Sequence, residues 1–421
     1  MNRSPDHPIT RSPDLTFLLS AGEASGDTYG AQLIEALRQL APNSTFFGMG
    51  GEKMQTSGAE LLVNANEVAV VGLVEVVTHL PGIRRRFKHL VAEAARRKPS
   101  AAILIDFPDF NLRLARELHR LGIPVFYFVS PQIWAWRTGR VQQIKKYVRK
   151  MIVIFPFEQE FYARHGVEVS YVGHPLAYVP QPKISREEFA ARHGLDPSKQ
   201  WIALLPGSRR KEVRLNLPTM LQAAQLLQKQ NKGFEFVLPV ASTLSPDWLR
   251  DQLAVSTAGW SRPSGLRSEH HDTAALAAEV TPEDALIHLT HNARATLMHA
   301  RAAVVASGTA TVEAALSGTP FVVVYRLAPL TWLLSRRLVK LDTFAMPNLI
   351  AGKKIVTELI QKDFTAQNVA RELNAIIPDG PARQQMEAAL KVVQQRLHDS
   401  QDAEPPSHRA AREILGALKT G

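Results

Sequence analysis

The chain has 421 residues, 45% of them hydrophobic and 21% charged, so it can bury a full core and its length favours two domains. The absence of cysteine excludes disulfides and thiolate metal sites. A formal net charge of +11 favours anionic partners, but the sequence has no zinc-finger spacing, RNA-binding aromatic signature or basic heptad helix, which argues against nucleic acid.

Residues 1–13 are rich in proline, serine and charge, and we interpret them as a loose tail. Residues 14–182 then read as a first domain in which short apolar strands alternate with helices, beginning with strand Leu15–Ser20, a turn over Gly22–Asp27 and helix Tyr29–Leu40. Further strands are predicted at Thr45–Gly48, Ala101–Asp106, Pro124–Val129, Lys150–Phe155 and Glu168–Val172. Such alternation predicts a parallel sheet covered by helices on both faces.

An apolar stretch over Val68–Val77 is followed by the cations Arg84, Arg85, Arg86 and Lys88. This pattern is typical of a segment that lies at a membrane surface, with Val70, Val71, Leu73 and Val74 as the apolar contacts. From the pattern alone, a core helix with a solvated basic end is the preferred explanation. No stretch reaches the roughly 18 apolar residues of a membrane span, and no signal peptide is apparent, so we expect a cytoplasmic chain.

Asp106 follows the continuous apolar run Ala101–Ile105, so we expect it at the carboxyl edge of the first sheet, where ligands bind in open α/β folds. Two other acids lie in similar turns. Asp109 is better explained as a helix cap before Asn111–Leu118. For Glu23, an orienting or acceptor-binding role is as good an explanation as catalysis.

Residues 183–364 read as a second domain of the same kind, starting with helix Arg186–His193. Its strands are predicted at Ile202–Leu205, Phe234–Pro239, Ala285–Leu289, Ala303–Ala306 and Phe321–Val324. Residues 256–282 lack a clean period, and we interpret them as a surface insertion. Residues 365–421 are predicted to form C-terminal helices. One possible arrangement is that these helices cross back and pack on the first domain.

Two turns of the second domain are suited to phosphate. After strand Ile202–Leu205 come Gly207, Ser208 and Arg209, with further cations where a helix should begin, and cations there make better sense facing an external anion. After strand Ala303–Ala306 come Ser307, Gly308 and Thr309 at a helix start, with Glu313 placed to accept ribose hydroxyls. The alternatives are a solvated basic turn and an ordinary capped turn. Together the two turns suggest a site for a diphosphate that carries a sugar.

Nine segments in one order resemble the lipid-A-disaccharide synthase family over about residues 15–400. They are Ala21–Asp27, Phe47–Gly51, Val71–Val76, Asp106–Asn111, Ser130–Arg137, Val172–Pro175, Leu205–Arg209, Ala306–Thr309 and Pro347–Asn348. The resemblance implies an α/β chain of the GT-B-like class, in which two doubly wound, Rossmann-like parallel-sheet domains face each other across a cleft. It also implies an inverting transfer that condenses UDP-2,3-diacylglucosamine with 2,3-diacylglucosamine 1-phosphate (lipid X) to give lipid A disaccharide 1-phosphate and UDP.

The resemblance further assigns roles. Asp106 is implied as the general base, with Glu23 and Asp109 as rivals, and Arg209, the Ser307–Thr309 turn and Glu313 as donor-binding groups. Asn348 is implied near the nucleotide, although a turn residue after Pro347 is an equal interpretation. No cofactor is expected, and no Asp-x-Asp sequence occurs that would serve a metal-bridged diphosphate clamp.

Because both substrates carry acyl chains, the resemblance favours contact of the Val68–Lys88 region with the anionic inner face of the inner membrane, and it leaves a homodimer open. The sequence is also compatible with two other functions. A UDP-sugar 2-epimerase-like enzyme on the same plan would need no lipid acceptor, and a non-catalytic basic adaptor at a membrane would bind no UDP.

Overall fold

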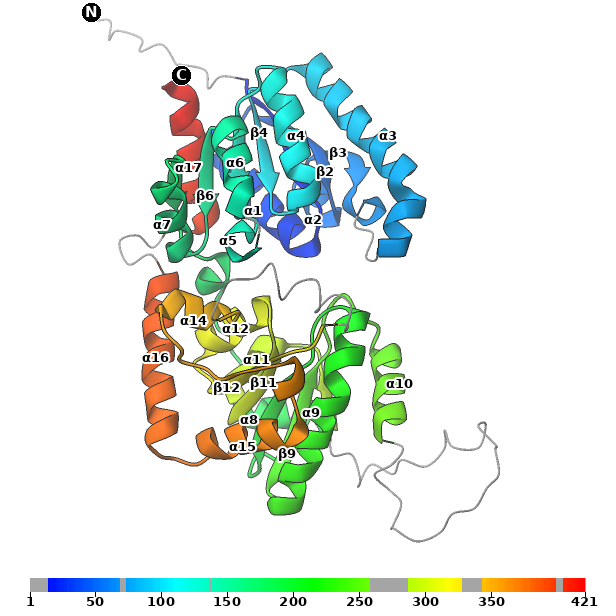
Figure 1. Ribbon diagram of the computed structural model, residues 1–421, viewed down its shortest axis with the longest axis vertical. Helices are drawn as coiled ribbons and strands as arrows, with labels where there is room; N and C mark the ends of the chain where they lie inside the picture. The colour runs from blue at the N-terminus through cyan, green and yellow to red at the C-terminus, as the bar shows by residue number, and fades with distance from the viewer. Residues whose placement is uncertain are drawn as a thin grey trace, which may run out of the picture. The chain divides into compact units, whose positions relative to one another are not determined.

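The structure is a computed structural model that describes residues 14–68, 73–136, 138–257, 287–327, 343–398 and 404–420. It divides into two compact units, residues 1–178 with 397–421 and residues 179–396. Each unit is an α/β domain with one parallel sheet, which confirms the predicted fold class for each half (Figure 1). Val70 and Val71 and nearly all of the 256–282 insertion lie outside the described residues.

The first unit contains a seven-stranded sheet in the order β3-β2-β1-β4-β5-β6-β7, and all of its paired strands are parallel. The strands are β1 (Thr16–Ala21), β2 (Thr45–Gly50), β3 (Glu60–Asn64), β4 (Ala101–Ile105), β5 (Val125–Phe128), β6 (Lys150–Val153) and β7 (Val169–Tyr171). The chain winds in one direction from β1 to β3 and in the other from β4 to β7. The change of direction falls between β1 and β4, which is where open α/β sheets bind ligands.

Helices cover both faces of this sheet (Figure 1). They are α1 (Ala24–Leu40), α2 (Glu52–Thr56), α3 (Leu73–Arg97), α4 (Pro108–Arg120), α5 (Ile133–Trp136), α6 (Val141–Tyr147), α7 (Pro156–Arg164) and α17 (Pro406–Lys419). Alternate strand residues enter separate apolar cores: Phe17 and Leu19 pack on one face, and Leu18 packs on the other. This two-residue period is the expected result of a strand buried on both sides.

The C-terminal helix α17 belongs to the first unit and packs against α1 (Figure 1). Its buried residues Ala410, Ala411 and Ile414 join the apolar core that also contains Phe17. An ion pair of 2.6 Å between Lys150 and Glu413 ties the same helix to the start of β6. The last helix of the chain therefore completes a layer of the first sheet.

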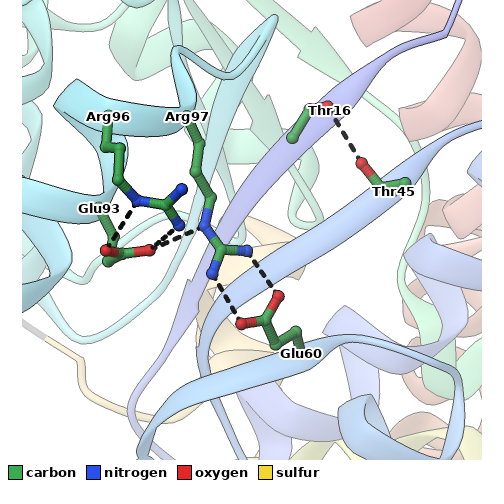
Figure 2. Close-up of polar contacts among 6 residues, drawn as sticks. All are labelled: Thr16, Thr45, Glu60, Glu93, Arg96 and Arg97. Atoms are coloured by element: carbon green, nitrogen blue, oxygen red, sulfur yellow. Dashed lines mark hydrogen bonds and ion pairs between the residues drawn. The ribbon is translucent and has the colours of Figure 1, made fainter.

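Helix α3 is fixed at its C-terminal end by a network of charges (Figure 2). The guanidinium of Arg97 pairs with Glu60 on β3 at 2.5 Å and with Glu93 at 2.8 Å, and it lies over the ring of Phe47. Hydrogen bonds from Arg96 and Arg97 lower the pKa of the Glu93 carboxyl to about 2. These contacts hold one end of α3 to the sheet, whereas its other end begins at Leu73, next to residues 69–72, which lie outside the described part of the chain.

The second unit contains a six-stranded parallel sheet in the order β10-β9-β8-β11-β12-β13. Its strands are β8 (Gln200–Leu205), β9 (Phe234–Pro239), β10 (Ile287–Thr290), β11 (Ala302–Ala306), β12 (Phe321–Tyr325) and β13 (Glu358–Ile360). Its helices are α8 (Arg186–His193), α9 (Arg210–Gln230), α10 (Pro246–Thr257), α11 (Ala293–His299), α12 (Thr309–Ser317), α14 (Met346–Ala351), α15 (Ala366–Ile376) and α16 (Pro381–Leu397). Here the direction of winding changes between β8 and β11.

Candidate functional site

In the first unit, Asp106 lies in the turn that follows β4, at the point where the winding direction changes. Asp106 and Phe107 both have positive φ, at 46° and 50°. Two successive residues other than glycine in the left-handed region are strained, and such strain persists only where the surroundings impose it. The backbone N–H of Asp106 donates to the carbonyl of Val129 at 3.2 Å, which holds the turn against the end of β5.

The side chain of Asn111 imposes this turn. It is fully buried, and its amide nitrogen donates to the carbonyl oxygens of Asp106 at 2.9 Å and Ser20 at 3.1 Å. Its amide oxygen accepts from the hydroxyl of Ser20 at 2.6 Å. The hydroxyl of Tyr127 donates to the Asp106 carbonyl as well. One amide therefore joins the ends of β1 and β4 and fixes the backbone that carries Asp106.

Glu23 lies in the neighbouring turn, after β1, where it is the extended N-cap residue of α1. A Cβ on Gly22 would lie 2.3 Å from the ring of Phe107, so only glycine allows the two turns to pack together. The structure thus places Glu23 and Asp106 on adjacent turns of one sheet edge. Asp109 is not the N-cap residue of α4 that the sequence suggested. Helix α4 already begins at Pro108, and Asp109 sits in its first turn with an exposed carboxylate that pairs with Arg140.

A buried carboxyl that the sequence prediction did not single out lies close to the same edge. Glu158, in the first turn of α7, is 1% exposed and accepts hydrogen bonds from Nε1 of Trp134 at 3.1 Å and from the backbone N–H of Phe155 at 3.3 Å. Burial raises the pKa of this carboxyl to about 8, and the negative charge of Asp106 acts in the same direction. Glu158 is therefore protonated at neutral pH, and it holds Trp134 in the segment after β5.

His174, which precedes a proline, is a buried structural histidine. It is 1% exposed, its ring packs against Phe155, and its Nδ1 accepts from the backbone N–H of Leu176 at 3.2 Å. Burial lowers the pKa of His174 to about 3, so it is neutral at physiological pH. The side chain of Trp136, and Arg137, lie outside the described residues.

In the second unit, Gly207, Ser208 and Arg209 form the turn between β8 and α9. Gly207 has a φ of +125°, and a Cβ there would lie 2.6 Å from the carboxylate of Glu212. That carboxylate accepts from the backbone N–H groups of Ser208 at 3.1 Å and Arg209 at 3.3 Å, and it lies 3.9 Å from the Arg209 guanidinium. The anion-binding end of α9 is thus filled by the chain's own carboxylate.

The second phosphate-type turn lies directly beside the first, because β11 pairs with β8. The backbone N–H of Ser307 donates to the carbonyl of Val324 at 3.0 Å, and Gly308, with a φ of 145°, is the N-cap residue of α12. A Cβ on Gly308 would meet no atom within 4 Å, so the space in front of this helix start is open. Thr309 is the first residue of the helix. The two predicted phosphate turns are therefore neighbours at the winding change of the second sheet.

Glu313 lies in the second turn of α12 and is half-buried. Burial raises the pKa of its carboxyl, and the positive charge of Arg294 opposes this rise. Asn348 is 1% exposed, and its side-chain amide is fully used. It donates to Val356 and Glu358 and accepts from the backbone N–H groups of Ile355 and Val356. Asn348 therefore holds the loop between α14 and β13.

The membrane-contact prediction falls only partly on the described residues. Arg84 and Arg85 are exposed on α3, and Arg86 pairs with Glu67 at 2.7 Å. Leu73 and Val74 begin α3, but their side chains lie outside the described part of the chain, as do Val70 and Val71. Within the described ranges, no helix is both long and apolar enough to cross a bilayer. No group of three His, Asp or Glu side chains suited to a metal ion occurs there either.

Comparisons with known proteins agree on one family. The family model described as Lipid-A-disaccharide synthetase matches residues 17–256 and 264–412. A lipid-A-disaccharide synthase of Koribacter versatilis is 51% identical over 406 residues, which cover 96% of this chain and 99% of that protein. The corresponding protein of Acidobacterium capsulatum is 52% identical over 384 residues, covering 90% of this chain and 91% of the relative.

Solved structures at much lower identity share the fold. The S. aureus MnaA–UDP co-structure is similar with a TM-score of 0.61 at 13% identity, covering 96% of this chain and 97% of that one. The calicheamicin glycosyltransferase CalG4 gives a TM-score of 0.56 at 14% identity, with 97% and 99% covered. At these identities the likeness establishes the two-domain architecture alone.

Proposed function

This chain belongs to the lipid-A-disaccharide synthase family, and from that premise we propose which of its residues carry the family's reaction. The enzyme is a glycosyltransferase that condenses UDP-2,3-diacylglucosamine with 2,3-diacylglucosamine 1-phosphate to give lipid A disaccharide 1-phosphate and UDP. The observation that carries the proposal is the pair of polar sheet edges, one in each unit, both at the change of winding within a chain that matches the family over most of its length.

For the acceptor, we assign the general base to Asp106. The reaction requires that the 6-hydroxyl of the acceptor sugar lose its proton as its oxygen attacks the anomeric carbon of the donor from the face opposite UDP. A carboxylate on a rigid turn can take that proton, and Asn111 and Tyr127 supply the rigidity through the Asp106 carbonyl. Glu23, on the adjacent turn, orients the acceptor sugar. Asp109 is the weaker candidate because its carboxylate is paired with Arg140.

For the donor, we assign the diphosphate to the adjacent turns of Gly207–Arg209 and Ser307–Thr309, and the ribose to Glu313. Backbone N–H groups and a guanidinium would offset the charge that develops on the departing UDP. Glu212 occupies the first of these turns in the described structure, so diphosphate binding there requires that its carboxylate give way and that Arg209 turn to phosphate. Asn348 would act indirectly, by shaping the loop beside the nucleotide.

For the surroundings, we propose that the enzyme works at the anionic inner face of the inner membrane as a peripheral protein. Both sugars carry acyl chains, so the acceptor must be drawn from a lipid phase. The exposed Arg84 and Arg85 of α3, which follow an apolar segment, provide charge for lipid phosphates. The same proposal includes a homodimer as the form of the enzyme.

The decisive experiment measures disaccharide formation from the two lipid substrates in wild type and in Asp106→Asn. We expect turnover to fall roughly 10²- to 10⁴-fold while UDP affinity and thermal stability remain at wild-type values, because only the proton acceptor is lost. Asp109→Asn is the matched control and should keep most of the activity. Near-normal turnover in Asp106→Asn would reject the base.

The same preparation distinguishes the remaining alternatives. Conversion of a UDP-sugar to its 2-epimer without lipid acceptor would favour an epimerase, and failure to bind UDP would favour an adaptor. A complete, metal-reversible loss of disaccharide formation in excess EDTA would overturn the metal-free assignment.

A further inference from the structure

One buried donor in the second unit has no partner among the described residues. Arg294 lies in the first turn of α11, just beyond the carboxyl end of β10. Its Nη2 donates to the carbonyl of Val179 at 3.0 Å, but its Nη1 is buried and makes no hydrogen bond with any described residue. A buried guanidinium N–H without an acceptor lowers the stability of the fold, and such groups are rare in native structures.

A half-buried acceptor lies on the next helix. Glu313 is in the second turn of α12, which packs beside α11 (Figure 1). Burial raises the pKa of its carboxyl and the charge of Arg294 opposes this rise. Among the described residues, no hydrogen bond reaches that carboxyl. Arg294 and Glu313 are thus near enough to act on each other electrostatically, yet within the described residues no direct ion pair joins them.

A group that satisfies both side chains must accept from a guanidinium and donate to a carboxylate. A hydroxyl does both. An ionised phosphate can only accept, and an amide N–H can only donate. A sugar diol fits best, since its two hydroxyls can share the two side chains. Both residues follow strands that end at the ligand-binding edge of the sheet, where the proposed nucleotide would present its ribose.

We propose that Arg294 is a second ribose-binding residue, whose Nη1 donates to a ribose hydroxyl of UDP while the diol donates to Glu313. This rests on the proposed function, in that it needs UDP to bind in the second unit. Arg294 then makes the site selective for ribonucleotides. Because its Nη2 also holds Val179, at the start of the second unit, the same side chain connects the sugar to the first residue of that unit.

The test is calorimetric binding of UDP, 2′-deoxy-UDP and 3′-deoxy-UDP to the full-length protein. Wild type should prefer UDP over at least one deoxy analogue. Arg294→Met and Glu313→Gln should each reduce that preference by on the order of 10-fold, mainly by weakening UDP. The double variant should lose no more than the stronger single variant, because both side chains act on one diol. Arg301→Met is the matched control, since the Arg301 guanidinium is satisfied by Ile377 and Asp379.

Arg294→Lys guards against a folding defect, because it keeps a cation and a donor for Val179. It should lose the preference as Arg294→Met does. If Arg294→Met or Arg294→Lys keeps the wild-type preference for UDP, or lowers the affinity for all three nucleotides equally, Arg294 does not contact the ribose and the inference fails. A wild type that binds UDP without preferring it over the deoxy analogues also ends the inference, yet leaves the proposed function intact. A wild type that binds no UDP overturns the proposed function itself.

Discussion

At the scale of single residues, buried polar side chains position the turns of the first unit, and Glu158 is one whose pKa is strongly shifted. Its carboxyl lies among Trp134, Phe155 and Phe157, with a hydrogen bond to each oxygen and very little access to water. Water would stabilise its charged form, so burial favours the protonated form. The folded protein therefore contains a neutral carboxylic acid next to its proposed catalytic edge.

This neutral acid makes stability depend on pH in a predictable direction. The pKa of Glu158 is about 8 in the folded protein against 4.5 for an ordinary glutamate, so between these values the unfolded chain is ionised and the folded chain is not. Unfolding then releases a proton, and stability falls as the pH rises from 4.5 to 8. A tenfold change in a proton-binding constant corresponds to about 1.4 kcal/mol, which puts the whole loss of stability on the order of 5 kcal/mol.

Glu158→Gln should remove this dependence. The difference in melting temperature between Glu158→Gln and wild type should become more favourable to the variant from pH 5 to pH 8, whatever its value at pH 5. Glu160→Gln, an exposed change on the same helix, should show a constant difference. Parallel curves for Glu158→Gln and wild type would mean that Glu158 is ionised in the folded state.

At the scale of elements, the strand positions were largely predictable from sequence, because strands buried on both faces are continuous apolar runs between turns. The strands predicted from Leu15, Thr45, Ala101, Ile202 and Ala303 are confirmed within a few residues. The strand prediction missed β3 and β13, which are edge strands, five and three residues long, that each begin with a glutamate. β3 and β13 are only partly buried and lack the continuous apolar run, so composition alone does not separate these two strands from loops.

The site was predictable only where it follows strand ends. Asp106 and Arg209 could be placed because a parallel sheet brings its carboxyl ends to one edge. The roles of Asn111, Glu158 and Arg294 could not, because each depends on a partner that lies far away in the sequence or on a buried atom that has no partner among the described residues. The helix cap expected at Asp109 was wrong for a local reason: the left-handed turn at Phe107 starts α4 earlier.

Asp27 shows how one acid can organise an element. It is buried, and its carboxylate accepts from the backbone N–H groups of Gly51 at 2.7 Å, Lys53 at 3.1 Å and Met54 at 3.1 Å, at the start of α2. Asp27→Ala should cost roughly 1 to 3 kcal/mol of unfolding free energy, since these donors lose their partner. Urea denaturation would measure the loss, with Asp27→Asn intermediate and Glu35→Gln, exposed on α1, near zero. An unchanged Asp27→Ala would show that the cap contributes nothing.

At the scale of the whole molecule, the excess of positive charge is relevant to the two anionic targets that we propose, the nucleotide and the lipid surface. The proposed nucleotide site in the second unit uses the guanidinium groups of Arg209 and Arg294. The exposed cations Arg84 and Arg85 of α3 belong to the first unit. The attraction of a surface cation to anionic lipid weakens with its distance from the membrane, and salt screens it.

Replacing Arg84, Arg85 and Arg86 by glutamine should therefore weaken binding to vesicles that contain anionic lipid. Each cation close to such a surface contributes about 1 kcal/mol, so we expect a loss of roughly 10- to 100-fold, with Arg86 contributing least because it is paired with Glu67. The measurement is vesicle co-sedimentation at low and high salt, and the difference should shrink at high salt. The control replaces Arg192, Arg250 and Arg371 by glutamine, which lowers the net charge by the same three units, from +11 to +8, at exposed positions of the second unit. If both triple variants lose affinity equally, overall charge and not the surface of α3 attracts the protein to lipid. If neither does, the basic end of α3 has no part in membrane contact.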